Sequence, residues 1–222
     1  MGNLVYKDLC VDAVDAAAAA RFWAPTLGLQ PERRGDLYLL SDGTDGHSVW
    51  INPVAEPNSV KQRVHIDVHV GSITELTDRG ARVLDDDSFS WTLMADPEGG
   101  ELCAFVRSPA ELPSYRLYEL IVDAQDPPSI ARWWAERFGV EAQHDEDDGW
   151  LEQAPGMPWE LIFQKVPEPK LVKNRIHWDV VGDTAELLAA GATLLRSRDG
   201  ERAWDVLADP EGNEFCVFEP EG

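Results

Sequence analysis

The sequence predicts an α+β protein of two tandem domains, each made of paired strand–helix–strand–strand–strand modules. Two observations lead to this prediction. First, the 222-residue chain repeats itself at an offset that grows only from 111 to 113 residues, so that ADPEGGELCAFV recurs near the end as ADPEGNEFCVFE. Second, each repeat alternates strand-like segments of period two with helix-like segments that carry caps. We place the domains at residues 1–108 and 114–222, on either side of a link that contains two prolines.

Each repeat opens with an apolar strand that leads into a helix. The strands are LVYKDLCVDA and RLYELIVDA, and both are rich in the residue types that strands favour. Asp15 and Asp126 stand where a helix N-cap is expected, and Gly28 and Gly139 stand where the left-handed residue at a helix end is expected. Short strands such as DLYLLS and GWLEQ then complete the first module of each repeat.

The second half of each repeat restarts the same order. The strand RVHIDVHV or RIHWDVV leads to a short helix that ends at Gly80 or Gly191. Two further strands are joined by Asp-Pro-Glu-Gly, which has proline and glycine at the positions that a type I turn prefers. The chain therefore holds four modules. The pattern leaves open whether modules pair within a repeat or are exchanged between repeats.

Strand alternation predicts which side chains share a face of each sheet, because residues two apart point the same way. In RVHIDVHV, His65 and Asp67 share one face, and the apolar residues between them share the other. His177 and Asp179 hold the matching positions in the second repeat. We therefore expect the apolar face to pack under helices and the polar face to line a cleft.

The closing strands add thiols and aromatic rings to this polar face. Cys103 and Phe105 alternate with apolar residues in the first repeat, and Cys216 and Phe218 do so in the second. Acids, imidazoles, thiols and aromatic rings are thus expected on one face of each sheet. A lining with a few convergent polar groups is typical of a small-molecule site.

Taken together, these motifs resemble the vicinal oxygen chelate superfamily, which includes glyoxalases, extradiol dioxygenases and bleomycin-resistance-type binding proteins. The resemblance rests on FW and LG after the first strand, on NRIHWD and on DPEGNEFCVF, and it covers nearly the whole chain twice. It implies that paired modules form a curved mixed sheet around a U-shaped cleft. Where such proteins hold a metal, its ligands project into that cleft.

The resemblance also implies a set of ligand positions, one on the first and one on the last strand of each module. Carried onto this chain, these positions in the second repeat are Glu119, Glu160, His177 and Cys216. In the first repeat they are Asp8, Ser48, His65 and Cys103. Metal enzymes of the superfamily have a glutamate where this chain has a cysteine. The expected cofactor is therefore either none or a divalent metal (Zn, Ni, Mn or Fe) in the second domain, with zinc favoured if a thiolate binds.

Two functions stay open. The first, which the loss of the glutamate favours, is metal-free binding of a small organic molecule in aromatic-lined clefts, through Asp8, Trp50, His65, Cys103, Phe105, Trp159 and Phe218. The second is a divalent-metal-dependent lyase or isomerase of the glyoxalase type, in which Glu119 or Glu160 is the general base. A dioxygenase is less favoured, because iron sites of that kind use two histidines and one carboxylate.

Composition narrows the partners. Acidic residues outnumber basic ones 41 to 19, so the net charge is -22, which disfavours nucleic acid and anionic membrane as partners. We expect no signal peptide or membrane span, and the three widely spaced cysteines indicate a reduced, cytoplasmic protein. Two tandem domains can imitate a dimer of single domains, so a monomer and a homodimer are both compatible with the sequence.

Overall fold

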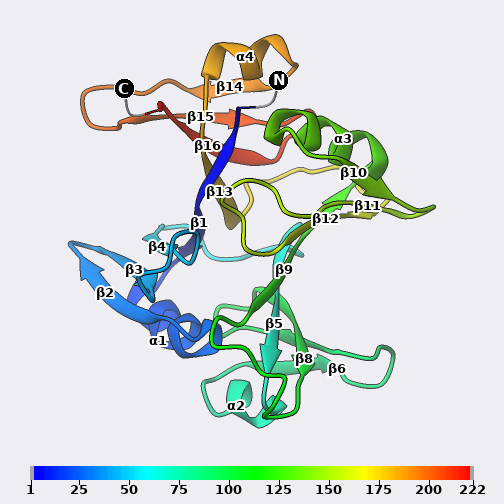
Figure 1. Cartoon of the computed structure of the whole chain (residues 1–222). Coiled ribbons are helices and arrows are strands. Elements are labelled where there is room, and N and C mark those ends of the chain that lie inside the picture. The colour runs from blue at the N-terminus through cyan, green and yellow to red at the C-terminus, as the bar shows by residue number, and fades with distance from the viewer. Residues whose placement is uncertain (1–2, 221–222) are drawn as a thin grey trace.

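The computed structural model describes residues 3–220 and has the predicted α+β architecture. Four modules, each with the order strand, helix, strand, strand, strand, build two eight-stranded mixed sheets (Figure 1). The prediction of four such modules is confirmed.

The bounds of the elements follow the sequence repeats. Module 1 contains β1 (Val5–Ala13), α1 (Ala16–Leu27), β2 (Gln30–Arg34), β3 (Leu37–Ser41) and β4 (Val49–Pro53). Module 2 contains β5 (Val64–Val70), α2 (Ile73–Thr77), β6 (Arg82–Asp85), β7 (Thr92–Ala95) and β8 (Glu101–Val106). Module 3 contains β9 (Leu117–Ala124), α3 (Pro127–Phe138), β10 (Ala142–His144), β11 (Asp148–Leu151) and β12 (Glu160–Lys165). Module 4 contains β13 (Ile176–Val181), α4 (Thr184–Ala189), β14 (Thr193–Arg196), β15 (Trp204–Ala208) and β16 (Glu214–Phe218).

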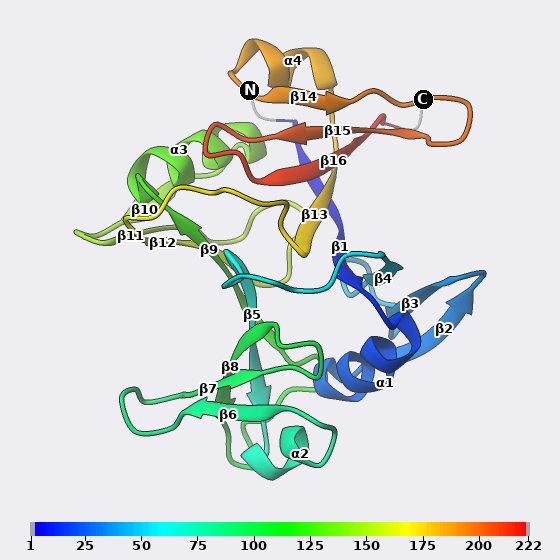
Figure 2. The same ribbon diagram turned by 180° about the vertical axis from the view of Figure 1, so that it is seen from behind.

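The modules pair across the two sequence repeats, which answers the question that the sequence leaves open. Sheet A has the order β14-β15-β16-β13-β1-β4-β3-β2 and joins module 4 to module 1. Sheet B has the order β10-β11-β12-β9-β5-β8-β7-β6 and joins module 3 to module 2. The short link between β8 and β9 stays within sheet B, whereas the connectors 54–63 and 166–175 pass from one sheet to the other (Figure 2).

The helices cover the apolar faces with large buried side chains. Trp23 of α1 is 2% exposed and Trp134 of α3 is 0% exposed. The caps are those that the sequence predicts: the Asp126 carboxylate accepts a hydrogen bond from the Ser129 N–H, and Gly139 has φ of 73°. The caps of α1 are equivalent. A left-handed backbone at the helix end favours glycine because a side chain there is strained.

The glutamate of each Asp-Pro-Glu-Gly turn connects the two sheets. The Glu98 carboxylate accepts hydrogen bonds from the backbone N–H groups of Val14, at 2.9 Å, and Asp15, at 2.8 Å. Glu211 does the same at the start of α3, with both distances 2.8 Å. Glu98 belongs to sheet B and α1 to the module in sheet A, so each turn satisfies unpaired amides at the start of a helix on the other sheet.

Candidate functional site

A row of polar side chains crosses the middle of sheet B. In the strand register, Asp67 lies opposite Cys103 on one side and Glu119 on the other, and Glu119 lies opposite Glu160. We call these four residues the sheet-B rung. They come from four adjacent strands, β8, β5, β9 and β12, and therefore from the first and last strands of modules 2 and 3.

Sheet A has a corresponding row. Asp179 lies opposite Cys216 and Asp8, and Ser48, the residue before β4, donates a hydrogen bond from Oγ to the Asp8 carboxylate. We call these four residues the sheet-A rung. The two rungs differ at the last position, where sheet B has Glu160 and sheet A has a serine.

The four metal ligands predicted for the second repeat are divided between the sheets. Glu119 and Glu160 belong to sheet B, whereas His177 and Cys216 belong to sheet A. The prediction combined positions of one sequence repeat, but each sheet combines modules of both repeats. The four residues therefore do not form a single ligand set, and the two glutamates instead share a sheet with donors of the first repeat.

The histidines lie beside the rungs rather than in them. His65 Nε2 is 3.3 Å from Asp67 Oδ1 and 3.7 Å from Cys103 Sγ. These three side chains offer ligand atoms that all lie within 4.8 Å of one another. His177 lies opposite Cys10 in the register and forms an equivalent cluster in sheet A. Strand alternation predicts that Asp67 lies on the polar face, but only the strand register shows that it is the centre of the site.

A β-bulge next to each rung adds one more side chain. The β5–β9 register shifts after the Asp67–Glu119 pair, so Tyr118 is an extra residue of β9. The β1–β13 register shifts in the same place, and there the extra residue is Lys7. The Tyr118 ring meets Phe105 at 5.2 Å between centroids, and Lys7 Nζ lies 4.6 Å from the centroid of Phe218. Bulges often occur beside active sites, where they redirect a side chain.

Aromatic rings continue from the bulge along sheet B. Phe89 stacks on Trp91 at 4.9 Å, and Trp91 stacks on Phe105 at 5.5 Å. With Tyr118 they form what we call the sheet-B aromatic wall. The neighbouring cavity of about 400 Å³ includes Tyr118 and Glu160 in its lining, and its volume suits a small organic ligand.

The two glutamates of the sheet-B rung have no lysine or arginine partner. Among residues 3–220, neither Glu119 nor Glu160 is within ion-pair distance of a lysine or arginine. Burial, together with the nearby charges of Asp67 and Glu160, raises the pKa of Glu119 to about 7, against the lowering effects of Tyr118 and Arg107. Burial likewise raises the pKa of Glu160 and of the Cys103 thiol. A carboxyl with a pKa near 7 can exchange a proton at neutral pH.

In the sheet-A rung, Asp8 is satisfied by its own neighbours. Asp8 pairs with Lys7 and accepts the Ser48 hydroxyl. Cys10 Sγ donates to Asp179 Oδ2 at 3.6 Å, and burial followed by the charge of Asp8 raises the pKa of Asp179 to about 7. At the last two rung positions, sheet A therefore presents fewer free carboxylates to a ligand than sheet B.

The remaining predicted ligand-binding residues, Trp50, Phe218 and Trp159, do not lie in one site. Trp50 lies opposite Cys10 on β4, and Phe218 stacks on Trp204 at 5.2 Å. Trp159 is 4% exposed and packs edge-on against Tyr6, with 5.1 Å between the ring centroids. It also lines the 400 Å³ cavity that includes Tyr118 and Glu160.

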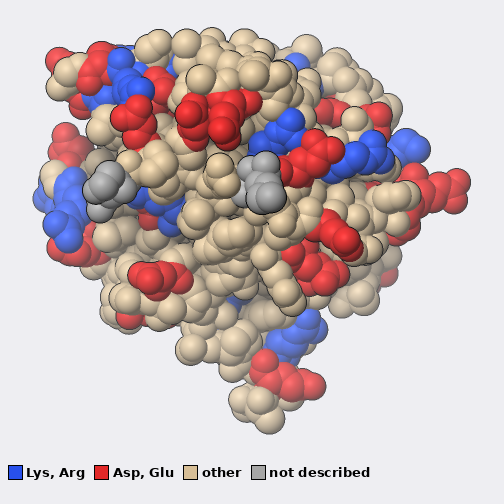
Figure 3. Space-filling view, turned by 45° about the horizontal axis from the view of Figure 1, so that its top comes forward, with Lys and Arg blue, Asp and Glu red and all other residues tan. Residues whose placement is uncertain are grey.

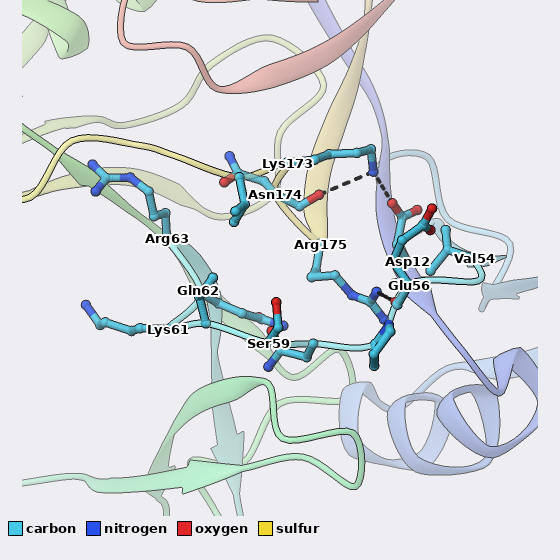
Figure 4. Close-up of a pocket in the computed structure, with 14 residues that line it drawn as sticks. Asp12, Val54, Glu56, Ser59, Lys61, Gln62, Arg63, Lys173, Asn174 and Arg175 are labelled. Carbon is cyan, nitrogen blue, oxygen red and sulfur yellow. Dashed lines mark hydrogen bonds and ion pairs between the residues drawn. The ribbon is translucent and has the colours of Figure 1, made fainter.

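A second cavity, of about 410 Å³, lies between the two connectors (Figure 4). Its basic groups already have partners: Lys173 pairs with Asp12, and Arg175 donates to the backbone of Glu56 and to the Glu98 carboxylate. On the face drawn in Figure 3, basic and acidic groups are interspersed in the same way. We therefore place the candidate site in sheet B, where the carboxylates lack such partners.

Two β-sheets of paired modules, each with a polar rung across its four central strands, define a vicinal oxygen chelate protein. The family model described as glyoxalase-like domain matches residues 8–105 and again residues 119–218, and the chain belongs to this family. No curated protein matches the sequence.

Solved structures share the fold at low sequence identity. Glyoxalase I from Zea mays is 12% identical with a TM-score of 0.67, and the match covers 98% of this chain and 92% of that chain. The cppA protein from Streptococcus pneumoniae is 11% identical with a TM-score of 0.51, over 98% of this chain and 100% of that chain. At this identity the likeness concerns the fold alone. No helix among the described residues has the length and apolar character needed to cross a membrane.

Proposed function

We propose that the chain binds a small organic molecule with an aromatic ring at the sheet-B site, formed by the sheet-B rung and the aromatic wall. The observation that carries the proposal is the bulge, because it brings Tyr118 against Phe105 directly beside the carboxylate of Glu119. A ring can pack on the wall while a polar substituent faces the carboxylates. Aromatic contacts of this kind contribute about 0.5–1.5 kcal/mol each beyond burial.

The charge of the site favours a ligand whose substituent is neutral or positive. Asp67, Glu119 and Glu160 lie on three adjacent strands. Arg107 is the nearby cation, but it lies 5.5 Å from the Phe105 and Tyr118 centroids and donates to His69 Nδ1 at 3.1 Å. An anionic substituent at the rung would be repelled.

Three probes of similar size test the proposal: benzylamine, benzyl alcohol and benzoate. Saturation-transfer difference NMR at pH 8, with chelator present, should show binding in that order of decreasing affinity. Phe105→Ala should weaken binding. Phe218→Ala is the matched control, because Phe218 holds the equivalent place in sheet A, and it should leave binding unchanged. Absence of saturation transfer for all three probes, or equal effects of both substitutions, would refute the proposal.

A second candidate function is a divalent-metal-dependent lyase or isomerase. The observation that favours it is the His65–Asp67–Cys103 cluster, in which Asp67 Oδ1 is buried without a hydrogen-bond partner. An imidazole, a carboxylate and a thiol fit a thiophilic divalent ion, with Glu119 as a neighbouring donor. Such an ion supplies Lewis acidity that polarises a substrate oxygen. Glu119, opposite Asp67 in the register, would be the group that accepts or returns a proton if it is not itself a ligand.

Metal content separates the two candidates. If the second function holds, elemental analysis of protein purified without chelator should find a metal content that falls in Cys103→Ser and in Glu160→Ala. Metal content that is the same in wild type and Cys103→Ser would exclude an ion at the sheet-B cluster and leave the binding function.

A further inference from the structure

Sheet A contains a Cys–His–Asp cluster of metal-ligand types whose cysteine comes from a different strand than in the sheet-B cluster. Cys10 Sγ, a His177 ring nitrogen and an Asp179 carboxylate oxygen all lie within 4.8 Å of one another. Cys10 and His177 face each other on β1 and β13, and Asp179 is two residues further on the same face of β13. Two paired strands, β1 and β13, therefore hold these three donors in place.

The donors are buried and only partly satisfied. Cys10 and Asp179 are each 5% exposed. Cys10 donates to Oδ2 of Asp179, but Oδ1 of Asp179 and Nδ1 of His177 are buried without a hydrogen-bond partner. Buried polar atoms are rarely left unpaired, because each costs about 1–3 kcal/mol. The unpaired atoms belong to two of the three clustered side chains.

A second thiol stands next to the cluster. Cys216 lies opposite Asp179 on β16 and is 6% exposed. Sheet B lacks this arrangement, because the position that matches Cys10 is Ile121, which lies opposite His65. Sheet A thus offers two sulfurs, an imidazole and a carboxylate, whereas the sheet-B cluster offers one sulfur.

We propose that sheet A binds one zinc ion through Cys10, His177 and Asp179, with Cys216 as the fourth ligand. Two thiolates, an imidazole and a carboxylate suit the tetrahedral, sulfur-rich coordination of structural zinc and disfavour magnesium and calcium. Four protein ligands leave no open position for substrate, so the ion has a structural role and ties β1, β13 and β16 together. Binding releases the thiol protons of Cys10 and Cys216 to solvent, so affinity increases with pH.

The test uses the full chain, freed of metal and titrated with Co²⁺ as a spectroscopic probe and with Zn²⁺ against a competing chelator. Co²⁺ should give a thiolate-to-metal charge-transfer band, and Zn²⁺ should raise the melting temperature. Cys10→Ser should reduce Zn²⁺ affinity by more than about 100-fold, because even loss of an outer partner of a ligand costs 10- to 100-fold. Cys103→Ser is the matched control and should keep the band and the affinity.

The proposal fails if Co²⁺ gives no charge-transfer band, or if Cys10→Ser binds Zn²⁺ as tightly as wild type. It also fails if Cys103→Ser abolishes the band while Cys10→Ser retains it, because the ion then lies in sheet B. Circular dichroism checks that Cys10→Ser is folded. If it is not, Asp179→Asn replaces it, and this variant should show the same loss of affinity with the charge-transfer band weakened.

Discussion

The two sheets share a scaffold but differ in how their rungs are neutralised. In sheet B the bulge presents Tyr118, and the last rung position is Glu160. In sheet A the bulge presents Lys7, and the last rung position is Ser48, and both contact Asp8. One extra residue in a strand thus decides whether a buried carboxylate has a partner. We interpret sheet A as a stabilising site and sheet B as a binding site.

This difference follows the usual conflict between stability and function. A rung whose groups are paired lowers the free energy of the folded state, whereas one that keeps free carboxylates for a ligand gives up part of that stability. The repeats must have similar local sequence to build the same modules. The distinction therefore lies in a few side chains around an unchanged backbone.

The largest expected difference concerns removal of the equivalent acid, Asp8 or Glu119, from each rung. At pH 8, Asp8→Asn should lower the free energy of unfolding by about 1–3 kcal/mol, because Lys7 and Ser48 lose a charged partner in a buried setting. Glu119→Gln should change it by less than about 0.5 kcal/mol or raise it, because Glu119 has no basic partner. Chemical denaturation measures both, and equal losses would remove the distinction between the sheets.

The next effect is on ligand affinity. Tyr118→Lys gives sheet B the bulge residue of sheet A, so the new ammonium should neutralise Glu119 and repel the charge of benzylamine. We expect the affinity for benzylamine to fall by about tenfold, equivalent to roughly 1.4 kcal/mol. Lys7→Tyr is the reciprocal control and should leave benzylamine binding unchanged in NMR titrations. A loss of the same size in both variants would indicate a general effect on the fold.

A smaller effect is expected in the pH dependence of stability. The folded-state pKa of Glu119 is about 7 and its ordinary value is 4.5, so the folded state binds this proton more tightly than the unfolded state. The contribution of protonated Glu119 to the free energy of unfolding is therefore fully present below about pH 4.5, and it is lost as the pH rises through about 7. In chelator, Glu119→Gln should flatten the fall in stability over this range. The exposed control Glu136→Gln should not, and an unchanged slope in Glu119→Gln would contradict the raised pKa.

Much of the fold could be predicted from the sequence because its signals are local. The capping residues, Asp126 and Gly139 among them, and the alternation around His65 depend only on neighbours in the chain. Module pairing depends instead on which strand edges meet. The patterns of β1 and β9 are compatible with either partner, so the sequence leaves the pairing open, and a ligand set taken from one repeat is divided between the two sheets.

The centre of each rung could not be predicted for a related reason. His65 and Asp67 share a face, and only the register with β8 and β9 shows that Asp67 stands opposite both Cys103 and Glu119. The bulge at Tyr118 has no sequence signature of its own. The partial signal was the repeated His-x-Asp pattern, which marks both residues as facing the site.

The smallest expected difference between the sheets concerns the reactivity of their thiols. In metal-free protein, burial and a neighbouring aspartate raise the pKa of both Cys103 and Cys216. Burial raises the pKa of Cys10 as well. Thiols react as thiolates, so none of the three should react with an aromatic disulfide reagent at pH 8 until the protein is unfolded. Absorbance during native and denatured labelling measures this, and mass spectrometry assigns the site. Rapid native labelling of Cys103 alone would show that sheet B opens to solvent more readily than sheet A. That result would strengthen the contrast between a closed site in sheet A and an accessible site in sheet B. Rapid labelling of Cys10 or Cys216 would instead contradict the closed structure of sheet A.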